Sequence, residues 1–258
     1  MRAPKRSYVL WFSQRVGSSL LAQALEDTAV AGRPREWLEA PSALDIMKKL
    51  HVTTALELRD LLWREATTPN GVLGIKYGMQ PKLHPEVTAL MASVAGRAAH
   101  ADDRSGWESF FPNCVHFFIT RRDKVRLAVS WWRAIKSDEW HRPNRSEPTA
   151  FGPSRSNVRV PRKDDYDYEA IDHLLTEANL RERAIQEQFA RWSVVPHTIV
   201  YEDFVPAYET TVRTVLEILE VADSRHRVIP KPAFAPLADA VSDAWYHRFL
   251  GDRRQWHT

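Results

Sequence analysis

The amino-acid sequence predicts an α/β protein with a P-loop-like architecture, a three-layer sandwich in which helices flank a central parallel sheet. Two segments rich in β-branched and aromatic residues, 7–12 and 114–120, have the composition of buried strands, and each leads directly into a helical pattern. Strand and helix patterns alternate along the chain, which favours parallel strands joined by right-handed helical crossovers. We expect residues 1–258 to form one domain.

The elements of the first half follow from the hydrophobic periodicity and its breaks. After strand 7–12, apolar residues recur at helical spacing from Ser18 onward. The other elements expected here are helices over 42–50 and 53–66, a turn with a short strand over 70–78, and a helix over 84–96. In helix 53–66 the residues expected to face inward are Leu56, Leu61 and Leu62.

The second half continues the alternation. Strand 114–120 (CVHFFIT) leads into a helix for which Asp123 is the expected N-cap. The core-facing stripe predicted for this helix is Val125, Ala128, Val129, Trp132 and Ile135. Segment 141–165 is rich in Pro, Ser and Arg, so we expect a long mobile loop. The remaining expected elements are a helix over 168–193, a strand over 197–204 and helices over 206–221 and 236–250.

The composition, 44% hydrophobic and 27% charged residues, is typical of a soluble globular protein. No apolar run of about 18 residues occurs, so no membrane span is expected, and the N-terminus lacks the pattern of a signal peptide. Cys114 is the only cysteine, which excludes an internal disulfide and favours a buried, unreactive thiol in a reducing cytoplasm. No histidine or cysteine pattern with metal-ligand spacing is present, so no metal site is expected.

The net charge of +3 is unevenly distributed. Segment 121–163 holds twelve Lys or Arg and four Asp or Glu, a local balance of +8, so the rest of the chain is acidic. One basic segment in an otherwise acidic chain indicates a local anion site.

The sequence S-Q-R-V-G-S-S, between the first strand and the first helix, is typical of an anion-binding loop. Gly17 allows backbone N–H groups to wrap an anion, and the helix that follows presents unpaired N–H groups and the positive end of its dipole. Ser18 and Ser19 can add hydroxyl donors, and Arg15 adds a fixed positive charge. A plain strand-to-helix turn capped by Ser18 is the alternative interpretation.

The same loop argues against ATP with magnesium. A P-loop nucleoside triphosphatase has the pattern G-x-x-x-x-G-K-[ST], whereas here Ser18 stands where lysine should follow Gly17. A nucleoside or sugar kinase with a degenerate phosphate loop is therefore a weak alternative.

A second anion site is expected where strand 114–120 ends. Arg122 comes just after this strand, and the carboxyl ends of parallel strands meet at one edge of a sheet. The helix that follows carries Arg126, Ser130 and Arg133 at helical spacing, although such a face is often only solvated. Two anion sites on neighbouring strand ends suit a nucleoside with phosphates at both ends.

Several segments together resemble the bacterial trehalose 2-sulfotransferase family, within the sulfotransferases. They are S-Q-R-V-G-S-S-L-L with the later G-R-P-R-E-W, I-T-R-R-D-K-V-R-L-A-V-S-W-W-R-A, G-V-L-G-I-K-Y-G, Y-D-Y-E-A-I-D and T-I-V-Y-E-D-F, and they span nearly the whole chain. The resemblance implies 3′-phosphoadenosine 5′-phosphosulfate as the donor. It also implies transfer of a sulfuryl group to an acceptor hydroxyl, which leaves adenosine 3′,5′-bisphosphate.

The resemblance also implies donor-binding residues. The residues implied to bind the 5′-phosphosulfate are Arg15, Val16, Gly17, Ser18 and Ser19, and those implied to bind the 3′-phosphate are Arg122 and Ser130, eight residues apart. Arg15 takes the place of a lysine that is common in eukaryotic relatives, and we expect it to stabilise the leaving-group charge. Val16 departs from the serine usual in the family, so one hydroxyl contact on the sulfate side is missing.

Glu36, in A-G-R-P-R-E-W-L, matches the acidic residue assigned as catalytic base in this family. Partial burial would have to raise the pKa of its carboxyl for that role, and the alternative is an ordinary surface carboxylate. His51 is the rival base. Lys76, at the end of a strand, and Trp140 and His141, at the start of the long loop, are expected to line the acceptor pocket, although Lys76 could equally reach solvent.

The expected partner is a small molecule or glycan that offers a hydroxyl group, such as trehalose or a secondary metabolite. A homodimer is suggested by analogy with the family, and no nucleic acid is expected. A non-catalytic nucleotide- or RNA-binding module that uses the +8 segment is the alternative from another functional class.

Overall fold

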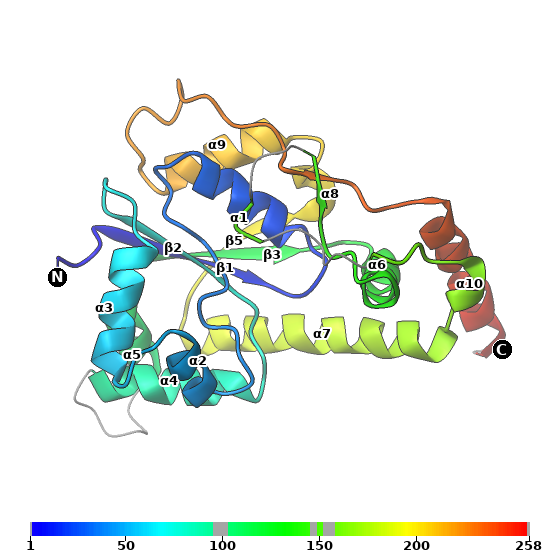
Figure 1. Cartoon of the computed structure of the whole chain (residues 1–258), viewed down its shortest axis with the longest axis horizontal. Coiled ribbons are helices and arrows are strands. Elements are labelled where there is room, and N and C mark those ends of the chain that lie inside the picture. The colour runs from blue at the N-terminus through cyan, green and yellow to red at the C-terminus, as the bar shows by residue number, and fades with distance from the viewer. Residues whose placement is uncertain (1, 95–102, 145–148, 152–157, 257–258) are drawn as a thin grey trace.

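The structure is a computed structural model that describes residues 2–94, 103–144, 149–151 and 158–256. Its centre is a four-stranded sheet in the order β2-β1-β3-β5, in which every neighbouring pair is parallel (Figure 1). The strands are β1 (Arg6–Phe12), β2 (Val72–Tyr77), β3 (Cys114–Thr120) and β5 (His197–Val200). Helices flank this sheet, which confirms the predicted α/β sandwich.

Strand β1 lies in the middle of the sheet because its residues are buried on both faces. Tyr8 and Leu10 belong to the hydrophobic core on one face, whereas Val9 and Trp11 belong to the core on the other. A parallel strand covered on both faces needs an uninterrupted apolar sequence. This explains the run Y-V-L-W-F.

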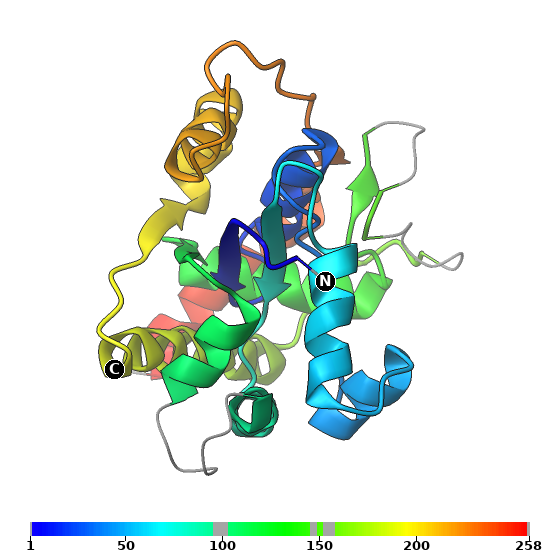
Figure 2. The same ribbon diagram turned by 90° about the vertical axis from the view of Figure 1, so that its left-hand side faces the viewer.

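Different helices pack against the two cores, except that α7 contributes its N-terminal half to one and its C-terminal half to the other. Helices α1, α6, α9 and α10 contribute to the core that contains Tyr8, and α3, α4, α5 and the C-terminal half of α7 to the core that contains Trp11. Figure 2 shows α1 and α9 on one side of the strands and α4 and α7 on the other. Each predicted helix is present; α1, α6 and α7 begin where the sequence predicts, and other ends differ by a few residues. The helices are α1 (Ser18–Asp27), α2 (Ala43–Lys49), α3 (Ala55–Glu65), α4 (Leu83–Val94), α5 (Asp103–Phe110), α6 (Lys124–Ser137), α7 (Tyr168–Arg191), α8 (Tyr201–Phe204), α9 (Tyr208–Ile218) and α10 (Ala240–Trp256), with a short 3₁₀ turn, η1 (Lys163–Asp165).

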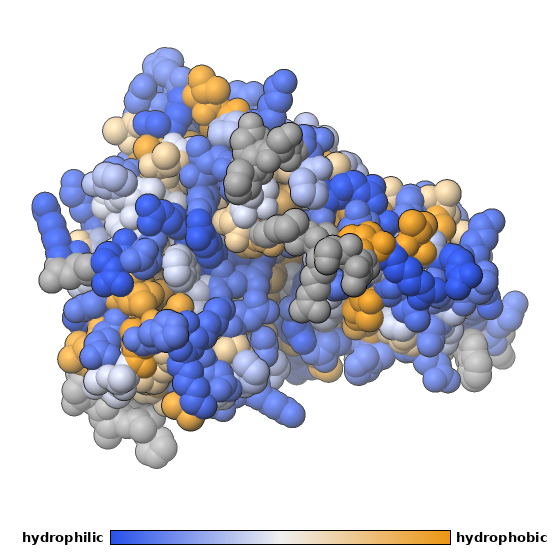
Figure 3. Space-filling model, viewed as in Figure 1, coloured by the Kyte–Doolittle hydropathy of each residue, from blue (hydrophilic) through white to orange (hydrophobic). Residues whose placement is uncertain are grey.

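The surface seen in Figure 3 is mainly hydrophilic, with apolar side chains in separate patches. Within the described ranges, no helix combines the length and the apolar character that a membrane crossing would require. Cys114, at the start of β3, is partly buried, and burial raises the pKa of its thiol, as expected of an unreactive cysteine.

The predicted strand 197–204 is wrong in its second half, because α8 begins at Tyr201. The turn brings the carboxylate of Glu202 to the backbone N–H groups of Arg122 and Asp123, at 2.9 and 3.1 Å. These bonds join the end of β5 to the end of β3. The helical turn therefore depends on a neighbouring strand, which local propensity cannot reveal.

Two residues predicted to face the core are exposed instead. Ile135 of α6 is 45% exposed, and Leu56 of α3 is 51% exposed. Of the stripe predicted for α6, Ala128 and Val129 are buried in the core. Leu127, Trp131 and Ala134 are buried as well, so the buried stripe is shifted from the predicted one. Apolar residues occur on more than one side of α6, and only the packing partners select the buried side.

Segment 141–165 contains structure that its composition does not predict. Strand β4 (Arg142–Pro143) pairs antiparallel with β6 (Phe234–Ala235), which anchors the start of this segment to the chain before α10. Residues 145–148 and 152–157, which make up much of the predicted mobile loop, lie outside the described residues.

Candidate active site

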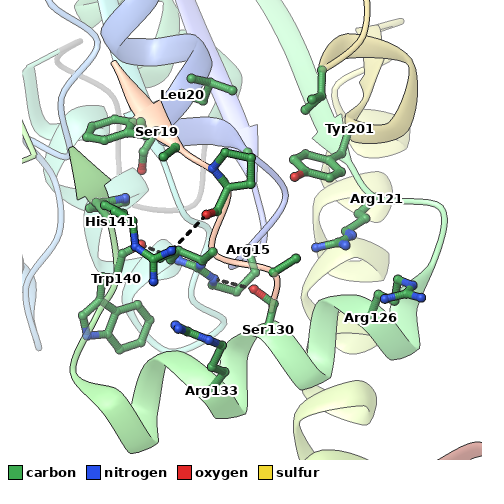
Figure 4. A pocket seen from close by; sticks show the side chains of 18 of the residues that line it. Arg15, Ser19, Leu20, Arg121, Arg126, Ser130, Arg133, Trp140, His141 and Tyr201 are labelled. Carbon is green, nitrogen blue, oxygen red and sulfur yellow. Dashed lines mark hydrogen bonds between the residues drawn. The ribbon is translucent and has the colours of Figure 1, made fainter. Parts of the chain in front are cut away.

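A cavity of about 350 Å³ opens at the carboxyl ends of β1 and β3 (Figure 4). This is the edge at which ligands bind to open α/β sheets. The loop after β1, helix α6, the start of α8 and the β4–β6 pair contribute to its wall. Its polar and aromatic lining includes Arg15, Gly17, Ser18, Ser19, Arg121, Arg126, Ser130, Arg133, Trp140, His141 and Tyr201.

The loop between β1 and α1 places the N-terminus of helix α1 at the cavity. Ser18 and Ser19 form the start of α1 and line the cavity. Gly17 is the N-cap residue and has a left-handed backbone with φ of 81°. A Cβ atom at this position would lie 2.7 Å from Cδ2 of Tyr201, so both the conformation and the close ring contact require glycine.

The side chain of Val16 belongs to the hydrophobic core rather than to the cavity. Val16 is fully buried in the core that contains Tyr8, and it is not among the cavity-lining residues. Its burial stabilises the fold by about 2 kcal/mol and holds the loop against the sheet. Only the backbone of Val16 is therefore suited to contact an anion. A backbone contact does not require the serine hydroxyl that is usual in the family, so valine is compatible with this role.

The side chain of Arg15 crosses the cavity toward α6. Its Nε donates a hydrogen bond to Oγ of Ser130 at 3.1 Å, and its Nη1 donates to the carbonyl oxygen of Trp140 at 2.7 Å. Burial, and then the neighbouring Arg121, lower the pKa of Arg15 to about 10, so it stays protonated at neutral pH. Because both hydrogen-bond partners are neutral, the positive charge remains available to an anion.

The two adjacent arginines after β3 have opposite environments. The side chain of Arg121 is 14% exposed, lines the cavity and stacks 4.6 Å from the ring centroid of Tyr201. The side chain of Arg122 is 62% exposed, does not line the cavity, and donates to the carboxylate of Asp203 at 2.6 Å. The structure therefore brings Arg121, and not the predicted Arg122, together with Ser130.

Other arginines of the cavity are paired with carboxylates, and Arg126 and Arg133 are two of them. Nη1 of Arg126 donates to Asp243 at 2.6 Å. Arg133, on the helix face predicted to border an anion site or to be solvated, is only 3% exposed and donates to Asp239 and Glu139, each at 3.0 Å. These pairs fix the shape of the wall, whereas Arg15 supplies a charge that is not neutralised in this way.

The predicted base, Glu36, lies next to strand β2. The backbone N–H of Lys76 donates to the carbonyl oxygen of Arg35 at 3.1 Å, which holds this segment beside the strand. The Lys76 ammonium forms an ion pair with Glu36 and also donates to Oγ of Ser19 at 2.8 Å. Lys76 is 3% exposed, and burial lowers its pKa, although Glu36 opposes this shift. Ser19 thus connects the Glu36–Lys76 pair to the anion loop.

Trp140 and His141, predicted for the acceptor pocket, both line the cavity. The imidazole of His141 lies 4.9 Å from the ring of Phe234, centroid to centroid. Burial lowers the pKa of His141 to about 3, and the positive charges of Lys76 and Arg15 add to the effect. His141 is therefore neutral at physiological pH.

His51, the rival base, lies in an exposed turn after α2 and is not part of the cavity lining. Among the described residues, no group of three or more His, Cys, Asp or Glu side chains is placed to hold a metal ion.

Arg121 and Tyr201 line the cavity but are not among the site residues predicted from the sequence. A signal for Arg121 existed, because alternate strand residues share a face: Phe117 and Ile119 belong to the core beneath the cavity, and Arg121 continues this series. No comparable signal marks Tyr201, since its position depends on the turn into α8.

The fold and the cavity define an α/β protein with arginines and a helix N-terminus at the carboxyl edge of its sheet, and without the lysine of an ATP-binding loop. Residues 7–252 match the family model described as Stf0 sulphotransferase, and the chain belongs to this family.

Two curated relatives are similar over nearly their whole length. The trehalose 2-sulfotransferase of Mycolicibacterium smegmatis is 28% identical over 282 residues, which cover 96% of each chain. The trehalose 2-sulfotransferase of Mycobacterium tuberculosis is 28% identical over 278 residues, which cover 96% of this chain and 95% of the relative. These matches confirm the predicted family and a sulfotransferase activity, and they lend no support to a kinase or an RNA-binding module.

Proposed function

We propose that the chain transfers a sulfuryl group from 3′-phosphoadenosine 5′-phosphosulfate to a hydroxyl group of a carbohydrate. The observation that carries this proposal is one cavity that joins the anion loop and Arg15 to Arg121, which follows β3, and to Ser130 of α6. Two such anion sites suit a nucleotide with a 5′-phosphosulfate and a separate 3′-phosphate. Membership of the Stf0 family supports the same donor.

The donor-binding roles follow from the lining of the cavity. The proposed 5′-phosphosulfate site consists of Arg15, the backbone of Val16 and Gly17, and Ser18 and Ser19. The proposed 3′-phosphate site consists of Arg121 and Ser130. Arg122 receives no donor contact in this proposal, because its side chain lies at Asp203 and outside the lining.

Glu36 is the proposed catalytic base. Its carboxylate accepts the proton of the acceptor hydroxyl while that oxygen forms a bond to sulfur and the bond from sulfur to the bisphosphate oxygen breaks. Arg15 stabilises the negative charge that the departing bisphosphate gains. Lys76 holds the carboxylate beside Ser19, which places the base next to the loop proposed for the phosphosulfate.

The proposed acceptor is trehalose, which the names of both relatives support. Lys76, Trp140 and His141 are the residues proposed to line its site together with Glu36. Two of them, Trp140 and His141, border the same cavity as the anion loop.

The proposal is tested by calorimetric titration with adenosine 3′,5′-bisphosphate, ATP with magnesium, and a short RNA. We expect tight binding of the bisphosphate alone. Incubation with the sulfate donor and trehalose, followed by mass spectrometry, should then yield a sulfated sugar. Stronger binding of ATP or RNA than of the bisphosphate would favour the kinase or the RNA-binding module instead.

A further inference from the structure

We propose that Phe151 determines acceptor specificity. In this inference, which rests on the proposed function, its ring stacks on the C–H face of a cyclic sugar and keeps water away from Glu36. The residue lies in the described part of segment 141–165.

The ring of Phe151 lies directly beside the proposed catalytic pair. Nζ of Lys76 is 4.8 Å from the centroid of the Phe151 ring and 4.3 Å from that of Phe12. The same Nζ forms the ion pair with Glu36. One ammonium group therefore separates the Phe151 ring from the carboxylate that would receive the acceptor proton.

The two rings that flank Lys76 differ in how deeply they are buried. Phe12, at the end of β1, is 6% exposed and belongs to the core. Phe151 is only partly buried and comes from a segment outside the sheet. Of the two rings, only Phe151 is therefore open to an acceptor that reaches the partly exposed Glu36, whereas Phe12 is covered.

The position of Phe151 is coupled to the anion loop through α1. The backbone N–H of Ala150 donates to Oε1 of Gln23 at 2.6 Å. Gln23 is 3% exposed, and its Nε2 donates to Asp27 at 2.7 Å, which fixes the orientation of the amide. Helix α1 thus carries the anion loop at its start and holds the Phe151 segment one to two turns later.

On its other side, Phe151 joins the aromatic wall of the cavity. Its ring centroid lies 6.0 Å from that of His141 and 6.4 Å from that of Phe234, and both of these residues line the cavity. The ring therefore stands between the proposed donor cavity and the Glu36–Lys76 pair.

This placement favours a particular acceptor class. Glu36 and Lys76 provide charged partners for hydroxyl groups, and Phe151 provides a flat apolar face with negative charge density. A sugar ring offers both surfaces, because its hydroxyls point outward from a framework whose C–H groups carry slight positive charge. An open-chain polyol has the hydroxyls but no such fixed face.

The inference is tested with Phe151→Ala and Phe151→Leu, assayed on trehalose and on the open-chain polyol sorbitol. We expect kcat/KM for trehalose to fall about tenfold or more in both variants, while that for sorbitol changes by less than about twofold. Donor hydrolysis without acceptor should rise several-fold in Phe151→Ala, because water reaches the site. Phe151→Leu keeps most of the packing volume, so a loss in that variant is due to the ring and not to misfolding.

The matched control is Val160→Ala, since Val160 belongs to the same long segment but is 79% exposed. It should behave as the wild type. Unchanged selectivity for trehalose over sorbitol, together with unchanged donor hydrolysis in both Phe151 variants, would overturn the inference alone. A wild-type protein that fails to bind adenosine 3′,5′-bisphosphate would overturn the proposed function and this inference with it.

Discussion

At the scale of single residues, the pair Arg121 and Arg122 shows how strand geometry decides which charge reaches the cavity. Successive side chains along an extended strand point to opposite faces, so neighbours in sequence face different surroundings. Arg121 stacks on Tyr201 inside the cavity, and Arg122 pairs with Asp203 at the surface. We therefore expect substitutions of these two arginines to affect ligand binding unequally, although their side chains are chemically identical.

Arg121→Ala should weaken binding of adenosine 3′,5′-bisphosphate by about 10- to 100-fold, because a charged hydrogen bond contributes about 1.5–3 kcal/mol. Arg122→Ala is the matched control and should change the affinity by less than about threefold, since its side chain is 62% exposed. Calorimetric titration measures both. A larger loss in Arg122→Ala than in Arg121→Ala would restore Arg122 as the ligand.

Glu36→Gln should lower kcat by about 10²- to 10⁴-fold, the range expected when a general base is removed. The affinity for the bisphosphate should stay within about twofold, because Glu36 lies outside the cavity lining. Glu39→Gln, three residues further on and exposed, should leave both quantities unchanged. Turnover of Glu36→Gln close to the wild-type rate would remove Glu36 as the base.

At the scale of elements, the loop between β1 and α1 is held from both sides. Val16 anchors it in the core, and the ring of Tyr201, at the start of α8, packs against Gly17. Glu202, next to Tyr201, binds the backbone N–H groups at the end of β3. The ends of three neighbouring strands thus meet around the helix N-terminus, which preorganises its N–H groups toward one point.

Gly17→Ala tests this arrangement. The left-handed backbone costs about 1–2 kcal/mol for a residue with a Cβ atom, and that atom would also crowd the Tyr201 ring, 2.7 Å away. We expect the free energy of unfolding to fall by about 1–2 kcal/mol or more in urea denaturation, with a loss of bisphosphate affinity.

Gly251→Ala is the control for that variant. Gly251 lies in α10, and a Cβ atom there meets no atom within 4 Å. Its stability should be unchanged or higher by up to about 1 kcal/mol, because alanine is the better helix former. Equal stability of the two variants would mean that Gly17 is not constrained.

At the scale of the whole molecule, the aromatic core on one face of the sheet contains two neutral histidines. Nε1 of Trp11 donates to Nδ1 of His116 at 2.9 Å, and the hydroxyl of Tyr77 lies 3.0 Å from Nδ1 of His84. Burial lowers the pKa of each histidine to about 4. The hydrogen bond from Trp11 requires an unprotonated Nδ1, so protonation of His116 breaks a buried contact.

Acidification should therefore destabilise the fold between about pH 6.5 and pH 4. In this window the unfolded chain binds protons at both histidines and the folded chain does not, which costs about 2 kcal/mol per histidine at pH 5. Urea denaturation followed by tryptophan fluorescence at pH 7 and pH 5 measures the difference. His116→Gln, whose amide oxygen can still accept from Trp11, should reduce it, whereas His173→Gln, at an exposed position, should not. The same pH dependence in His116→Gln as in the wild type would contradict this account.

The parts of the fold that depend on local pattern could be read from the sequence. The apolar run of β1 and the aromatic and β-branched residues of β3 predicted buried parallel strands. Asp123 predicted the start of α6, where its side chain accepts from the backbone N–H of Arg126 at 2.8 Å. The features that the sequence misplaced depend on distant contacts. The turn into α8 and the buried side of α6, where Ile135 is exposed, are both set by packing against other elements.

For the candidate site, the sequence by itself determined the position of the loop between β1 and α1, the absence of an ATP-type lysine and the family of the chain. These are properties of short contiguous motifs, in which spacing alone places a glycine and a helix N-terminus after a strand. Only the tertiary structure decided that Arg121 and not Arg122 lines the cavity, that the side chain of Val16 belongs to the core, and that Lys76 joins Glu36 to Ser19. Those relations connect residues on different strands, and the side-chain directions that create them exist only once the sheet has formed.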